Sequence, residues 1–155
     1  MPIKKIMYVC TGNVFRSPVA VGMTRQFLRD KGIRLESAGM LEYKGAPLSQ
    51  AIMELAERYG IDLSKHKPRK VDASLADAAD LILVFDKKQV TELIERFPQA
   101  RNKTYTIKSY AGCSDGRDME DLWNKPVQIY ENLIKELRGY LQKCVNRIET
   151  QNSEA

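Results

Sequence analysis

The segment that most restricts the fold is Leu81 to Phe85, an unbroken run of five apolar residues. A strand with one face in water alternates apolar and polar residues, whereas a strand covered on both faces does not. The run therefore predicts a strand buried within a parallel sheet. Because parallel strands need long crossover connections, usually helices, the rest of the chain should alternate strands with helices.

The remaining sequence fits that alternation. We predict further strands at Lys4–Val9, Ile33–Ala38 and Lys103–Ile107, and helices from Ser17-Pro18 to Gly32, from Pro47 to Gly60, over Lys87–Phe97 and from Pro126 to Ile148. These elements predict a single α/β domain over residues 1–155, with a four-stranded parallel sheet and helices on both faces. The polar end, from about residue 149 to 155, is expected to be a frayed tail.

Composition narrows the choice of partners. The chain has 155 residues, 43% apolar and 29% charged, with a net charge of +5, which is typical of a soluble domain and gives no reason to expect nucleic acid. No apolar stretch approaches the roughly 18 residues that cross a membrane, and the first residues do not form a secretory signal. The three cysteines are widely spaced and lack zinc-ligand spacing, so we expect no metal site and a cytoplasmic protein.

Chemistry is concentrated between the first predicted strand and the first helix. Cys10 lies where the strand ends and Arg16 where the helix begins, and the loop between them consists of Thr11, Gly12, Asn13, Val14 and Phe15. Such a loop can turn its backbone N–H groups inward, beside a helix N-terminus, to bind a phosphate. Arg16 can add a bidentate contact, and the positive field favours the thiolate of Cys10.

This motif, Val-Cys-Thr-Gly-Asn-x-x-Arg-Ser-Pro close to the N-terminus, resembles the signature of the low-molecular-weight protein tyrosine phosphatases. The resemblance extends over nearly the whole chain. It includes Ser37-Ala38-Gly39, the segment from Gly60 to Ser64, the strand Ala79–Val84 and the segment Asp118–Trp123, which occupies the place of the family's acid loop.

The resemblance implies hydrolysis of a phosphomonoester in two displacements without metal or cofactor. Cys10 would attack phosphorus to give a phosphocysteine, Arg16 would hold the phosphate, and an aspartic acid would protonate the leaving oxygen. The family places that aspartate before proline, whereas here Asp121 precedes Leu122. Asp121 is our candidate because of its distance from the last helix, and Asp118 is the alternative within the long aperiodic segment Lys108–Trp123.

The resemblance also assigns supporting residues. Asn13, Ser17, Ser37 and His66 would brace the phosphate-binding loop, although Ser17 could be an ordinary helix N-cap and His66 an ordinary surface histidine. Val14, Tyr43 and Trp123 would line a cleft for a flat ring, although Trp123 could simply pack at the start of the last helix.

Position 15 departs from many family members. They carry a second cysteine there, which protects the nucleophile through a disulfide, and this chain has Phe15. Cys113 could take over that protection or be a free structural thiol, and Cys144 has the helical spacing of a core residue.

Val14 predicts the substrate class, since in the family an aliphatic residue there accompanies phosphotyrosine and threonine accompanies phosphoarginine. The expected partners are a phosphotyrosine-containing protein or a small aryl phosphate, with inorganic phosphate as product and inhibitor. One alternative is a thiol-dependent arsenate reductase, which needs two more cysteines after the third strand, where this chain has Phe85-Asp86-Lys87-Lys88. Another is a phosphate-binding regulator with weak turnover. A nucleotide-binding domain is excluded, because neither a Gly-x-Gly-x-x-Gly motif nor a Walker lysine is present.

Overall fold

Four parallel strands lie at the centre of the fold, as the sequence predicts, and the structure gives their order as β2-β1-β3-β4. The computed structural model describes residues 2–113, 115–119 and 121–154. The strands are β1 (Lys5–Cys10), β2 (Arg34–Gly39), β3 (Leu81–Val84) and β4 (Thr104–Thr106). The helices are α1 (Arg16–Phe27), α2 (Gln50–Arg58), α3 (Ala73–Ala78), α4 (Lys87–Arg96), α5 (Ile107–Tyr110) and α6 (Val127–Ser153), with a 3₁₀-helix, η1, over Pro98–Lys103.

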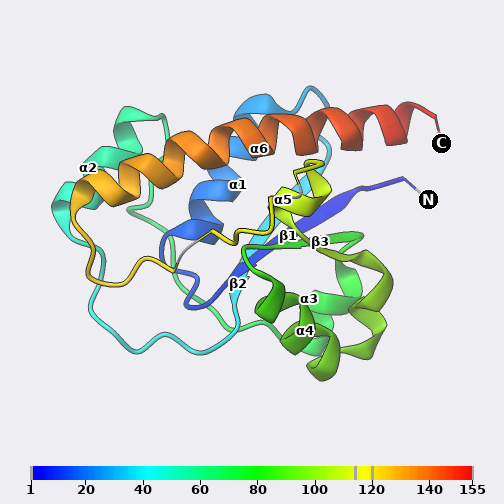
Figure 1. The fold of residues 1–155 in the computed structure, drawn as a ribbon, viewed down its shortest axis with the longest axis horizontal. Coiled ribbons are helices and arrows are strands. Elements are labelled where there is room, and N and C mark those ends of the chain that lie inside the picture. The colour runs from blue at the N-terminus through cyan, green and yellow to red at the C-terminus, as the bar shows by residue number, and fades with distance from the viewer. Residues whose placement is uncertain (1, 114, 120, 155) are drawn as a thin grey trace.

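Helices cover both faces of the sheet, and alternate residues of β1 and β3 point into two apolar cores. Helices α1, α2, α5 and α6 lie on one face, and α3 and α4 on the other (Figure 1). In β3, Leu81 and Leu83 point into the larger core, while Ile82 and Val84 point into the smaller one. All four are at most 2% exposed, which is why this run carries no polar residue.

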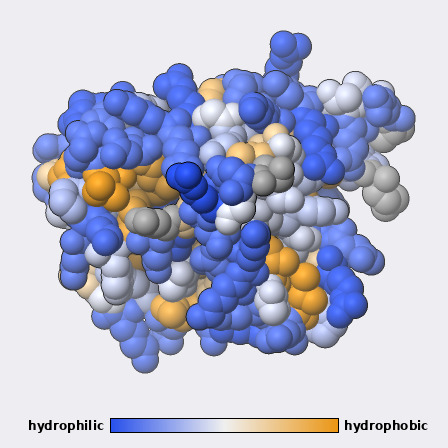
Figure 2. All heavy atoms as spheres, viewed as in Figure 1, coloured by the Kyte–Doolittle hydropathy of each residue, from blue (hydrophilic) through white to orange (hydrophobic). Residues whose placement is uncertain are grey.

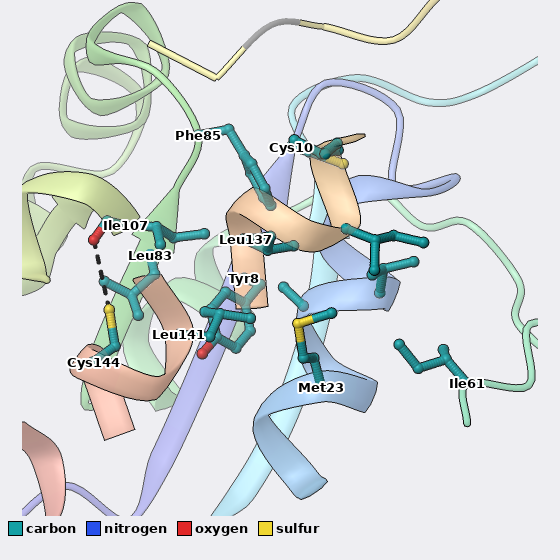
Figure 3. Close-up of a cluster of buried hydrophobic side chains, with 14 of the residues drawn as sticks. Tyr8, Cys10, Met23, Ile61, Leu83, Phe85, Ile107, Leu137, Leu141 and Cys144 are labelled. Carbon is teal, nitrogen blue, oxygen red and sulfur yellow. Dashed lines mark hydrogen bonds between the residues drawn. The ribbon is translucent and has the colours of Figure 1, made fainter. Parts of the chain in front are cut away.

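The larger core is built around β1 and the long helix α6. Tyr8, Leu83, Leu137 and Leu141 meet in its centre, and Cys10 lies at its edge, where β1 ends (Figure 3). Cys144 is completely buried, as its helical spacing predicts, and burial raises the pKa of its thiol to about 12. The loop that follows β1 is thus attached to the larger core.

Several details differ from the sequence prediction. Helix α1 ends at Phe27 and does not continue to Gly32. Ile107 begins the short helix α5 instead of ending β4, and neither α3 nor η1 was expected. The expected fraying from about residue 149 is absent as far as Ser153, because α6 continues to that residue. Asn152 fixes this end of the helix: its Oδ1 accepts from the backbone N–H of Ile3 at 2.7 Å, and its Nδ2 donates to the Ile3 carbonyl at 2.8 Å. Ala155, the last residue of the predicted tail, lies outside the described residues.

None of the helices in the described part of the chain combines the length and apolar character needed to cross a membrane.

Candidate active site

The loop between β1 and α1 lies where the order of the sheet reverses. From β1 the chain passes to β2 on one side and later to β3 on the other. In open parallel sheets such a reversal leaves a crevice at the carboxyl ends of the strands, where ligands bind. Cys10, the last residue of β1, lies at this position and is 3% exposed.

Asn13 holds the loop in shape from within. Its backbone φ is +57°, a left-handed conformation that asparagine tolerates better than most residues. Its completely buried side chain donates to Ser17 Oγ at 2.8 Å and to Ser37 Oγ at 2.9 Å, and accepts from the backbone N–H of Arg69 at 3.0 Å. The Asn13 carbonyl lies 2.6 Å from His66 Nε2, which must donate because a carbonyl can only accept.

Ser17 connects this network to Cys10. Its Oγ lies 3.0 Å from Cys10 Sγ, and because that oxygen already accepts a hydrogen bond from Asn13, its own proton is free to point at the sulfur. A donor in this position stabilises a thiolate. The N-cap of α1 is Phe15, without a side-chain capping bond, so Ser17 is not an ordinary N-cap. The structure therefore brings together the four residues that the resemblance assigns to loop bracing.

Arg16 is held at the loop by several partners although it is only 3% exposed. Its Nη2 donates to Thr11 Oγ1 at 3.2 Å and to Asp121 Oδ1 at 3.1 Å, and its Nη1 reaches the Met119 carbonyl at 3.4 Å. Its guanidinium lies 5.0 Å from the ring centroid of Phe85. A guanidinium fixed in this way can make the planar, bidentate contact that phosphate oxygens require.

Sequence reasoning missed one polar residue of the site, Gln89. It is 4% exposed, donates from Nε2 to Thr11 Oγ1 at 3.2 Å and accepts from the backbone N–H of Phe85 at 2.9 Å. Gln89 thus connects the end of β3 to the phosphate-binding loop. Its position in the first turn of α4, directly after a strand that neighbours β1, was the signal that could have identified it.

The two candidate acids lie in different places. Asp121 is 54% exposed, lines the same cavity as Cys10 and faces Arg16. Asp118 lines a separate hollow, and its Oδ1 accepts a hydrogen bond from the backbone N–H of Lys87 at 3.3 Å. The structure therefore brings Asp121, and not Asp118, to the cavity that Cys10 lines.

The cavity above the loop has a volume of about 840 Å³. Its walls are largely apolar and include Leu48 and Ile52, and Tyr43 and Trp123 stand at it with ring centroids 5.9 Å apart and an angle of 66° between their planes. Trp123 is 63% exposed, so it does not serve mainly to pack the start of α6. Hydrophobic atoms gather on the side of the molecule where α6 begins, on an otherwise mostly hydrophilic face (Figure 2).

The loop backbone can receive an anion. Among the hydrogen bonds of the described residues, none is donated by the backbone N–H of Gly12, Val14 or Phe15, and all three residues line the cavity. Phe15, at the position of the family's second cysteine, is 4% exposed and packs edge-to-face on Tyr130, with ring centroids 4.9 Å apart. The residues that the structure describes contain no cluster of side chains suited to hold a metal ion.

The comparison with protein families now adds to this geometry. The model of the low molecular weight phosphotyrosine protein phosphatase family matches residues 5–154. The chain belongs to this family. It is accordingly a phosphatase, an enzyme of the hydrolase class, and its fold is the family's fold.

Individual relatives agree. A probable low molecular weight protein-tyrosine-phosphatase, EpsP of Ralstonia nicotianae, is 32% identical over 94% of this chain and 97% of its own. A protein-arginine-phosphatase of Geobacillus stearothermophilus is 28% identical over 95% of this chain and 97% of its own. Among solved structures, the arginine phosphatase YwlE from the same organism superposes with a TM-score of 0.86 at 27% identity, over 99% of this chain and 97% of that one. The tyrosine phosphatase AmsI of Erwinia amylovora has a TM-score of 0.81 at 25% identity, over 94% of this chain and 93% of that one.

Proposed function

We propose that this protein hydrolyses phosphotyrosine and related aryl phosphomonoesters through a phosphocysteine on Cys10. The observation that carries the proposal is one shared cavity: Cys10 lies in its wall with Ser17 Oγ 3.0 Å from the sulfur, and Arg16 and Asp121 line the same space. In this proposal Cys10 is the nucleophile, Arg16 the cationic clamp and Asp121 the acid, and the cavity that all three line supports these roles.

In the first step, the Cys10 thiolate attacks phosphorus while the bond to the aryl oxygen breaks. Asp121, in its acid form, gives its proton to that oxygen, so the product leaves as a neutral phenol. The free N–H groups of the loop and Arg16 stabilise the negative charge on the phosphoryl oxygens.

In the second step, the Asp121 carboxylate removes a proton from a water molecule that attacks the phosphocysteine. The sulfur–phosphorus bond breaks, the Cys10 thiolate returns, and inorganic phosphate leaves. Phosphate should also inhibit, because it binds the same donors as the substrate.

Asp121 Oδ1 accepts a hydrogen bond at 3.1 Å from Arg16 Nη2, which is one of the donors that would bind a phosphate. Substrate binding should therefore exchange the carboxylate of Asp121 for a phosphoryl oxygen at Arg16. The carboxyl group, on an exposed loop position, then becomes free to meet the leaving oxygen.

The shape of the cavity supports an aryl substrate. Tyr43 and Trp123 offer two ring faces, and Val14, which lines the cavity beside them, presents only methyl groups. Arginine phosphatase is the second candidate, because a relative that is 28% identical and a solved structure that is 27% identical bear that name. Val14 argues against it, since a valine cannot hydrogen-bond to a guanidinium.

The proposal is tested with p-nitrophenyl phosphate and phenyl phosphate in the absence of added metal. We expect wild-type turnover, no turnover by Cys10→Ser, and a loss of about 100-fold or more by Asp121→Asn on phenyl phosphate, whose leaving group needs the proton. Asp118→Asn is the matched control and should retain wild-type activity. If Asp121→Asn is unimpaired on phenyl phosphate while Asp118→Asn is impaired, the acid assignment is wrong.

Hydrolysis of phosphopeptides separates the two substrate classes. A phosphotyrosine peptide should be hydrolysed with a higher kcat/KM than a phosphoarginine peptide of the same sequence, and Val14→Thr should shift the ratio toward phosphoarginine. The opposite preference in the wild type would make the protein an arginine phosphatase. An inert wild type that still binds phosphate would support a regulator, and thiol-dependent turnover of arsenate would support the reductase.

A further inference from the structure

Lys108, in α5, is a buried lysine close to the loop that carries Asp121. It is 6% exposed, and its Nζ donates to Asp115 Oδ1 at 2.8 Å and to the Arg117 carbonyl at 2.7 Å. The ring of Tyr140, from α6, has its centroid 5.5 Å from Nζ. A lysine is rarely buried to this degree without a partner that compensates its lost hydration.

The bonds of Lys108 hold a turn of the loop from below. Asp115 Oδ1 accepts from the backbone N–H of Arg117 at 3.0 Å in addition to the lysine, so the lysine and the turn share one carboxylate oxygen. Burial alone would lower the pKa of Lys108, but the hydrogen bond with Asp115 and the neighbouring Tyr140 and Cys113 raise it overall. The lysine therefore stays charged at neutral pH.

The other hydrogen bonds of residues 115–119 and 121 are longer, and they include the bonds from Arg16 to Asp121 Oδ1 at 3.1 Å and to the Met119 carbonyl at 3.4 Å. The backbone N–H of Met119 reaches the Phe85 carbonyl at 3.4 Å, and Asp118 accepts from the backbone N–H of Lys87 at 3.3 Å. Charge-assisted bonds near 2.8 Å are roughly twice as strong as neutral ones. Leu122 follows Asp121 and leaves the backbone without the restriction that proline imposes. Because phosphate would displace Asp121 from Arg16, the bonds of Lys108 are the shortest ones left to fix the segment.

We propose that Lys108 is a positioning residue for the general acid: its two hydrogen bonds fix residues 115–117 and thereby the placement of the Asp121 carboxylate at the cavity. Lys108 itself is separated from the substrate, because it lines the hollow on the other side of the loop with Asp118. The inference rests on the proposed role of Asp121.

The test replaces Lys108 by methionine, which keeps the apolar stem and removes the charge and both hydrogen bonds. Misplacement of a reacting group by about 1 Å costs up to about 100-fold in rate. We expect kcat/KM to fall by about 10- to 100-fold on phenyl phosphate and by about threefold or less on p-nitrophenyl phosphate, whose leaving group hardly needs a proton. The quantity kcat/KM is used because it reports the steps up to departure of the leaving group.

Lys103→Met is the matched control. Lys103 also donates to two backbone carbonyls, those of Asp77 and Ala79. These lie on the face of the sheet that carries the smaller core, away from the acid loop. It should lose no activity on either substrate. Asp115→Ala, a change at an exposed side chain, should reproduce the leaving-group effect of Lys108→Met with a smaller amplitude, which covers the case in which Lys108→Met folds poorly.

A double variant makes the assignment specific. In an Asp121→Asn background, Lys108→Met should cause no further loss on phenyl phosphate, because the loop then has no acid to place. Equal losses on both substrates, or losses that add in the double variant, would overturn the proposal.

Hydrogen exchange separates this proposal from the proposed function. Lys108→Met, and not Lys103→Met, should speed amide exchange at residues 115–119 whether or not Asp121 is the acid. If exchange is unchanged, Lys108 does not fix the loop. If exchange is faster while Asp121→Asn behaves as wild type, the loop contact stands and the acid assignment fails.

Discussion

Replacing Asn13 separately by glycine and by alanine divides the contributions that hold the phosphate-binding loop. Glycine removes the three side-chain hydrogen bonds to Ser17, Ser37 and Arg69 but tolerates the backbone φ of +57°. Alanine removes the same bonds and also strains the backbone. Both variants keep the bond from His66 to the Asn13 carbonyl.

The magnitude follows from counting these contributions. A buried hydrogen bond contributes about 1 kcal/mol net, so three bonds give about 3 kcal/mol for Asn13→Gly. The left-handed conformation adds roughly 1 kcal/mol for Asn13→Ala. With a slope of about 2 kcal/mol per M in urea, the unfolding midpoint should fall by about 1.5 M for glycine and about 2 M for alanine. The expected losses are smaller than the 5–15 kcal/mol that is typical of a domain, so both variants should still fold.

Urea unfolding measures the midpoints, and repeating it in inorganic phosphate measures how well each loop binds the anion. Ligand that binds only the folded state raises stability by RT ln(1 + [L]/Kd), so the wild type should gain more from phosphate than Asn13→Gly. Equal midpoints for the two variants would refute the backbone argument. A midpoint shift below about 0.5 M for Asn13→Gly would refute the claim that these bonds hold the loop.

Two further predictions concern a backbone contact and a thiol. A Cβ added at Gly39 would lie 2.9 Å from the backbone carbon of Gly12, so Gly39→Ala should lower the free energy of unfolding by about 1–3 kcal/mol and weaken phosphate binding. Thermal unfolding measures the loss. The control is Gly139→Ala, where the new Cβ has open space and should stabilise α6. Because burial raises the pKa of Cys144 to about 12, its thiolate is absent at mildly alkaline pH and forms only as the pH nears that value. Iodoacetamide should therefore label Cys144 only in unfolded protein, and labelling of the native protein, seen by mass spectrometry, would contradict this.

Sequence patterns were sufficient wherever one interaction dominates. The run Leu81–Phe85 predicted a doubly covered strand because burial on both faces leaves no place for a polar residue. The motif from Cys10 to Arg16 predicted a tight loop between a strand and a helix, and the structure has this loop between β1 and α1. These two features together indicated the sheet, its layers and the position of the site.

Tertiary contacts decided what the sequence left open. Asn152 carries no periodic signal, and its two bonds to Ile3 extend α6 beyond the expected fraying point. Asp118 and Asp121 are alike in sequence, and only the path of the loop between α5 and α6 brings Asp121 to the cavity and Asp118 to the neighbouring hollow. In the sequence Lys108 looks like any lysine of a polar loop. Its contact with Tyr140, which lies far away in the chain, is visible only in the structure.

The pairing of Asn152 with Ile3 has a consequence for how the protein can be attached to something else. It brings the beginning of β1 and the end of α6 together at the amino ends of the parallel strands, and both ends of the chain lie on the same side of the molecule (Figure 1). Cys10 lies at the opposite, carboxyl edge. A surface, tag or second domain joined to either end therefore leaves the cavity facing outward, and a short linker between the ends would close the chain into a circle without passing near the phosphate-binding loop.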